Sequence, residues 1–133
     1  MGSKDAEDRF FEAVRNFRIA DDKARNGGPS SIDAQAFKMA EIDLDAAIPG
    51  LSGVMLGRAL LLKADCLYRQ YLAGLDKVSI FEVIASVDPL LKEGHTCALK
   101  GRKILEELGS TVDLPWANDI VSRLGDYCSA GNL

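Results

Sequence analysis

The segment from Gly53 to Ala73 constrains the fold more than any other part of the chain. It is apolar around most of its circumference when it is drawn as a helix. Its polar side chains are few: Arg58, Lys63, Asp65, Arg69 and Gln70. A helix that is hydrophobic on nearly every side has to be covered by neighbours on more than one side. The sequence therefore predicts a central, deeply buried helix over residues 53–73.

Other segments also repeat apolar residues at the spacing of an α-helix. Beside the central helix, the expected helices cover residues 4–24, 32–48, a short stretch opened by Ser79, 89–108 and 115–128. Asn26 to Pro29 ends the first of these helices and Gly109 ends the one before the last, because glycine accepts a left-handed helix terminus and proline removes a donor. No segment alternates with period two, so we expect an all-α chain.

A capping box is the clearest local signal. Ser79 and Glu82 have the spacing at which a serine and a glutamate satisfy each other's backbone donors. Asp88 and Pro89 are typical of an N-cap followed by proline at the first helical position. We therefore expect a short helix between these signals and a new helix from Pro89, with one long helix kinked at Pro89 as the alternative.

The last expected helix, 115–128, has two clearly different faces. Asn118, Asp119, Ser122 and Asp126 form its polar side. The apolar side consists of Trp116, Ala117, Ile120, Val121, Leu124, Tyr127 and Cys128. A polar outer face on a terminal helix is what a stack of helices needs in order to end and stay soluble. We expect this helix to cap the fold.

Composition limits the classes of protein. With 133 residues, 47% of them hydrophobic, the chain can form one core, and we expect a single all-helical domain over 1–133. Met1-Gly2-Ser3 is typical of an expression tag, which leaves open whether the domain is excised from a longer protein. A net charge of −4 disfavours nucleic acid as a partner. The uncharged stretch 46–57 contains Pro49 and glycines, so we expect no membrane span.

Chemistry-bearing residues are sparse. Cys66, Cys97 and Cys128 form neither a C-x-x-C pair nor a disulfide framework, and no secretory signal is recognisable, so we expect a cytoplasmic protein without a metal site. His95 is the only histidine and has no second catalytic group beside it. No nucleotide-binding or hydrolase motif is present. We expect no cofactor and no enzymatic activity.

A weak internal repeat links two of the helices. Residues 60–68 recur loosely as 97–105, keeping a lysine, the small residue after it and two apolar residues beyond. If Pro89 ends a repeat, several residues fall near the positions where the tetratricopeptide repeat prefers large, small and aromatic side chains. They are Leu61, Ala64, Tyr68 and Phe81. Over residues 58–109 the chain thus resembles that family.

The resemblance implies a short, right-handed stack of antiparallel helical hairpins. The first helix of each hairpin would line a concave side that holds a peptide or a partner segment. A helical bundle without true repeats is the alternative fold.

The candidate binding surface lies on the central helix. Arg58 and Arg69 share one edge, Lys63 marks the other, and Leu62 and Cys66 lie between them. In the weak repeat, Lys100 takes the place of Lys63. An apolar floor with basic walls suits a partner segment that carries acidic residues, and this predicts partner binding by all six residues. Alternatively, a neighbouring helix covers the floor and the charges reach past it to water.

These observations favour a non-catalytic adaptor or chaperone-like module that binds a peptide or helix of a partner protein. The alternative is a subunit that forms a homo-oligomer through its apolar helix faces. An enzyme or a small-molecule sensor bundle is the least favoured reading.

Overall fold

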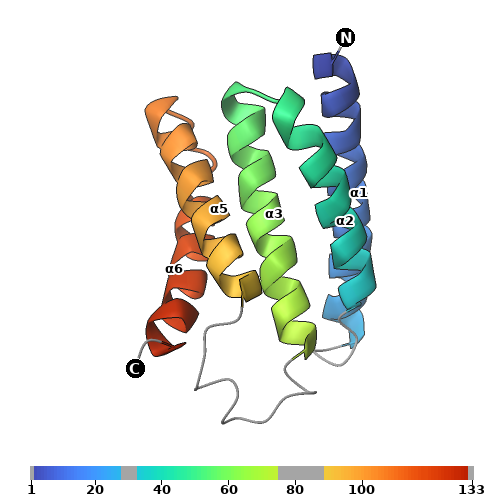
Figure 1. Ribbon diagram of the computed structural model, residues 1–133, viewed down its shortest axis with the longest axis vertical. Helices are drawn as coiled ribbons and strands as arrows, with labels where there is room; N and C mark the ends of the chain where they lie inside the picture. The colour runs from blue at the N-terminus through green and yellow to red at the C-terminus, as the bar shows by residue number, and fades with distance from the viewer. Residues whose placement is uncertain (1, 28–32, 75–88, 132–133) are drawn as a thin grey trace.

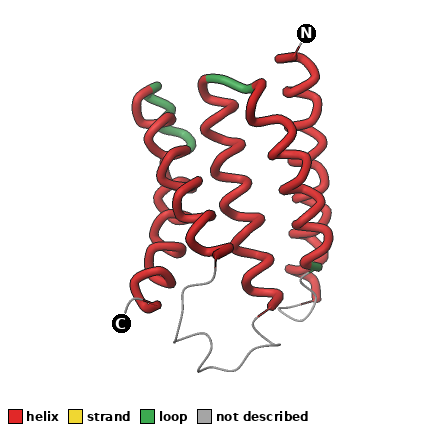
Figure 2. Tube along the Cα trace, in the orientation of Figure 1, coloured by secondary structure: helices red, strands yellow, loops and turns green. Residues whose placement is uncertain are grey.

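Five α-helices make up most of the described chain (Figure 1). The computed structural model describes residues 2–27, 33–74 and 89–131. The helices are α1 (Gly2–Gly27), α2 (Ala34–Ala47), α3 (Gly53–Gly74), α5 (Pro89–Glu107) and α6 (Leu114–Gly131), and the 3-10 turn η2 (Ile48–Gly50) follows α2. Within those ranges there is no strand, so the all-α prediction is confirmed (Figure 2). The expected short helix and its capping box at Ser79 lie outside the described residues.

Successive helices run in opposite directions, so the chain passes up and down (Figure 1). Helices α1, α3 and α6 run one way, and α2 and α5 run the other way. The main helix contacts are α1 with α2, α2 with α3, α3 with α5 and α5 with α6. Helix α3 therefore lies in the middle of the row. Of the helices described, none is both long and apolar enough to cross a membrane.

Polar and glycine residues fix the helix ends. Asp33 caps α2, because its side chain accepts a hydrogen bond of 3.1 Å from the backbone N–H of Ala36. Gly109 ends α5 as predicted: its φ is +70°, and the following N–H of Ser110 donates to the carbonyl of Leu105 at 2.9 Å. Asp113 precedes α6, and its carbonyl accepts from the N–H of Ala117.

Two hydrophobic cores meet on α3. Leu62 and Cys66 belong to a core shared with α1 and α2, whereas Leu61 and Ala64 belong to a core shared with α5 and α6. The buried residues of α3 include Ala59, Leu61, Leu62, Ala64, Asp65, Cys66, Leu67, Tyr68 and Tyr71. The prediction of a central helix buried on more than one side is confirmed.

Small residues bring α3 and α5 close together. A Cβ on Gly101 would lie 2.8 Å from the carbonyl oxygen of Gly57, and a Cβ on Gly94 would lie 3.4 Å from that of Ala64. Residues 64 and 101 are the small residues of the weak repeat. Both lie where the antiparallel helices α3 and α5 pack against each other. Close packing of these two helices is therefore enough to explain why both positions have small residues.

Gly101→Ala is expected to destabilise the protein by about 1–3 kcal/mol, because the new methyl group overlaps the backbone of Gly57. This loss exceeds the gain of up to about 1 kcal/mol that alanine brings to a helix interior. Urea denaturation measures the change in the free energy of unfolding.

Gly125→Ala is the matched control, since the nearest atom to its added Cβ is His95 Nε2 at 3.5 Å. This variant is expected to be as stable as the unmodified chain or slightly more stable. If both alanine variants have the same stability, the close approach of α3 and α5 at Gly101 is wrong.

Candidate functional site

Leu62 and Cys66, the expected apolar floor of the binding site, are buried. Cys66 is fully buried and Leu62 is 6% exposed, because α1 and α2 pack over this side of α3. The prediction that these two side chains form an open floor is therefore wrong: neighbouring helices cover Cys66 completely, and Leu62 keeps only a small exposed edge, which lines a cavity beside α1. The cause is that α3 needs two covering layers, and the first hairpin supplies one of them.

Arg58 and Arg69, two of the expected basic residues, are ion-paired with carboxylates of other parts of the chain. Arg58 Nε donates to both carboxylate oxygens of Asp113 at 3.1 Å, which ties α3 to the start of α6. Arg69 donates to Asp21 of α1 at 2.7 Å and to Asp65 at 3.2 Å. Both arginines lie on the side of α3 that faces α1 and α6.

Lys63 lies on the other side of α3 and bridges two helices. Its Nζ is 2.6 Å from Asp45 of α2 and 3.1 Å from Glu93 of α5. Burial lowers the pKa of Lys63, but the hydrogen bonds to both carboxylates outweigh burial and raise it. Lys100 is exposed on α5 and lines the same cavity as Lys63. The six expected residues are thus split between a buried interior and two opposite faces.

A groove runs along α3 between α1 and α6, and we name it the aromatic groove. It consists of two adjoining cavities of about 350 and 850 Å³ that share Phe17, Asp21 and Trp116. Its remaining lining residues are Phe10, Phe11, Val14, Arg18, Arg25, Met55, Arg58, Leu62, Asp65, Tyr68, Arg69, Asp119, Ile120 and Arg123. Arg58, Leu62 and Arg69 of the expected site belong to this groove.

The half of the groove nearer the start of α1 is apolar. Phe11 is 59% exposed there, and it meets Phe10 edge to face with ring centroids 5.7 Å apart. Met55 and the half-buried Trp116 lie opposite. Trp116 packs against both cores and is the only tryptophan of the chain. This half therefore has an exposed apolar surface to which Phe11 contributes most clearly.

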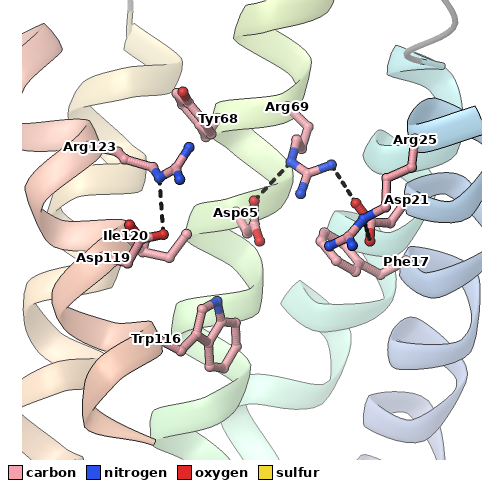
Figure 3. A pocket seen from close by; sticks show the side chains of 10 residues that line it. All are labelled: Phe17, Asp21, Arg25, Asp65, Tyr68, Arg69, Trp116, Asp119, Ile120 and Arg123. Carbon is pink, nitrogen blue, oxygen red and sulfur yellow. Dashed lines mark hydrogen bonds and ion pairs between the residues drawn. The ribbon is translucent and has the colours of Figure 1, made fainter. Parts of the chain in front are cut away.

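The other half is lined by paired charges (Figure 3). Arg69 donates to Asp65 and Asp21, Arg25 reaches Asp21 at 3.0 Å, and Arg123 pairs with Asp119 at 3.0 Å. The guanidinium of Arg69 also lies over the rings of Phe17 and Phe37, 5.6 and 5.5 Å from their centroids. Each carboxylate that lines the groove therefore has an arginine partner.

Asp65 is the most perturbed acid of this groove. Burial raises its pKa to about 6, although the charge of Arg69 acts in the opposite direction. Asp21 adds to the rise and Arg123 opposes it. A carboxylate held in this way is costly to keep ionised at neutral pH.

A second groove lies on the opposite face, between α2 and α5, and we name it the lysine groove. Two cavities of about 520 and 480 Å³ share Ile48, Leu60 and Lys100. The rest of its lining is Asp45, Pro49, Leu56, Lys63, Lys92, Glu93, Thr96, Cys97, Lys103, Ile104 and Glu107. Lys63 and Lys100 of the expected site lie here.

The sequence contained a signal for the aromatic groove. Phe10 and Phe11 are consecutive, and neighbouring residues on a helix point in directions about 100° apart. Only Phe10 can face the core shared with α2, so Phe11 must be exposed or must face another element. The contribution of Trp116 from the far end of the chain has no such local signal.

Comparisons with known proteins do not assign this groove. No protein-family model, curated protein or solved structure matches the chain. In the part of the chain that the structure describes, no group of three His, Cys, Asp or Glu side chains could hold a metal ion. Burial raises the pKa of the thiols of Cys66 and Cys97, which keeps them as thiols at neutral pH.

The raised pKa of Asp65 predicts a pH dependence of stability. The folded protein binds this proton more tightly than the unfolded chain does, so the contribution is complete below about pH 4 and is lost as pH rises through about 6. Relative to Asp65→Asn, the unmodified chain is expected to lose about 1–3 kcal/mol between pH 4 and 7. Urea denaturation across this pH range measures the difference.

Asp22→Asn is the control, because Asp22 is an exposed carboxylate on α1. Its stability should follow that of the unmodified chain at every pH. Parallel curves for the unmodified chain and Asp65→Asn would contradict the raised pKa.

Proposed function

We propose that this chain is a non-catalytic protein-interaction module that binds an amphipathic helix of a partner protein in the aromatic groove. One observation carries the proposal: a cavity of about 850 Å³ is lined mainly by apolar side chains, with Arg18, Asp21 and Arg58 as its charged members and Phe11 59% exposed. Apolar grooves between helices commonly receive the apolar face of another helix.

The dimensions support a helix as the occupant. The lining residues of α1 extend from Phe10 to Arg25, which is about 22 Å along a helix axis. This length matches about four turns of a partner helix. The walls α1 and α6 and the floor α3 all run in one direction. A partner helix that runs the opposite way would continue the alternation seen between the other neighbours.

The side chains indicate where the partner's residues bind. Its apolar anchors fit between Phe11, Met55 and Trp116, where aromatic surface can be buried with little loss of side-chain freedom. Its polar end meets Arg69 and Arg123, which are already ion-paired. Affinity here is therefore expected to come mainly from apolar burial.

The tetratricopeptide resemblance is compatible with this proposal but is not needed for it. In a short TPR-like solenoid the first helix of each hairpin lines the binding side. Two helices of the groove, α1 and α3, are such helices, and the third helix, α6, is not. We propose the hairpin stack as the architecture that presents the groove.

A photoreactive phenylalanine analogue at position 11 tests the proposal in the cells from which the chain comes. The same analogue at position 19 is the matched control, because Ile19 is 63% exposed on α1 but lies outside the groove. A single partner adduct is expected from position 11 and none from position 19. Equal adducts from both positions would overturn the proposal.

Substitutions then test the isolated partner. Phe11→Glu is expected to weaken its binding at least about tenfold, since it places a charge in the apolar half, whereas Ile19→Glu should change affinity less than about twofold. Trp116 emission should shift to shorter wavelength when the groove is filled. An unchanged affinity of Phe11→Glu would contradict the proposed site.

A homo-oligomer is the second candidate function. Met39 and Ile42 lie one turn apart on α2 and are 51% and 49% exposed, which gives a second copy an apolar contact. Sedimentation equilibrium of Met39→Glu/Ile42→Glu separates this function from the first. A dimer that this variant dissociates supports the oligomer, and a monomer at all concentrations excludes it.

A further inference from the structure

We infer that the lysine groove is a second docking surface, which takes an acidic amphipathic helix of a partner protein. The surface is independent of the aromatic groove, because it lies on the opposite face and is formed by α2, α3 and α5. The juxtaposition that carries the inference is an apolar floor beside three lysines of α5 that form no ion pair within the described part of the chain.

The floor is apolar and partly open. Ile48, Leu56, Leu60 and Ile104 are each half-buried, and they come from three different elements. Together they form a strip between α2 and α5 with α3 beneath it. A strip of this kind accepts aliphatic side chains from one face of a helix.

The charges beside the floor are unbalanced. Asp45 and Glu93 both contact Lys63, whose single positive charge balances one of these two carboxylates. Lys92, Lys100 and Lys103 are exposed, and none of them forms an ion pair with a described residue. Glu107 at the end of the groove is the remaining acid of its lining. Four lysines and three carboxylates line the groove, so it carries a surplus of one positive charge, and the three lysines of α5 provide it.

The lysines follow one edge of the floor. Lys92, Lys100 and Lys103 lie on one stripe of α5, over about 17 Å of helix. Thr96 lies on the same stripe and lines the cavity between them. A partner helix with leucine-like residues on one face and carboxylates along the neighbouring edge satisfies both parts of the groove at once.

The local surplus contrasts with the charge of the whole chain. The net charge is −4, so the exposed lysines of this groove form a positive site on a chain that is acidic overall. Such attraction acts mainly on orientation and association rate, and it weakens as salt rises.

The test uses designed peptides and the full chain. A fluorescein-labelled helix of about sixteen residues carries leucine on one face and glutamate beside it, and a second peptide has lysine at every glutamate position. Fluorescence anisotropy should show binding of the glutamate peptide, weaker binding at higher salt, and at least about tenfold weaker binding of the lysine peptide.

Charge reversals identify the surface. Lys100→Glu/Lys103→Glu is expected to weaken binding of the glutamate peptide at least about tenfold. The matched control is Lys4→Glu/Arg9→Glu, which changes the net charge equally at exposed positions on α1 and should alter affinity less than about twofold. The melting temperature should change little in both variants, and Lys100→Gln/Lys103→Gln replaces the first variant if it does not fold.

Several outcomes would overturn the inference. They are no binding of the glutamate peptide, equal binding of the lysine peptide, and equal weakening by the control reversal. Loss of binding in Phe11→Glu would place the peptide in the aromatic groove instead. Binding of phosphatidylserine vesicles or duplex DNA without binding of the peptide would also overturn it.

Discussion

Helix α3 has to be covered on two sides, and the rest of the structure follows from this constraint. The first hairpin covers the side of Leu62 and Cys66, and α5 with α6 covers the side of Leu61 and Ala64. Polar side chains on such a helix need partners, because an unpaired buried charge is costly. Arg58, Lys63 and Arg69 find carboxylates before α6, on α2 and α5, and on α1. The basic residues of α3 thus connect it to α1, α2, α5 and the residue before α6, which are all its neighbours among the described helices.

Local helix signals could be predicted from the sequence, whereas the ion pairs between helices could not. Periodicity and Gly109 predicted the described helices to within a few residues, because these signals act locally, whereas the predicted helix start at Asp88 and Pro89 borders residues outside the described chain. Arg58 and Arg69 were interpreted as walls of a binding site, since their acidic partners on other elements lie far along the chain; only Asp65, four residues before Arg69, is a local partner. Asp113 is far along the chain from Arg58, and Asp21 is far from Arg69. Such pairings depend on how the helices are placed, which the periodicity of one helix does not contain.

The two grooves have the same geometrical origin. A row of antiparallel helices around α3 brings α1 near α6 on one face and α2 near α5 on the other, and neither of these pairs is among the main helix contacts. The seam between each pair is therefore filled only partly. Trp116 lines the first seam, and Ile48, Leu60 and Lys100 line the second. Lys63 and Lys100 fell in one seam, as the weak repeat suggested, because both follow the α3–α5 interface.

The seams differ in how their charges are compensated. In the aromatic groove Arg69, Arg123 and Arg25 each have a carboxylate partner on a neighbouring turn or helix, so a ligand there meets arginines that are already ion-paired and a large apolar surface. In the lysine groove Asp45 and Glu93 both contact Lys63, which leaves the lysines of α5 to the solvent. Binding in the first groove should therefore respond weakly to salt, and binding in the second should respond strongly. The two surfaces beside the central helix can thus select partners differently, the first through apolar burial and the second through charge.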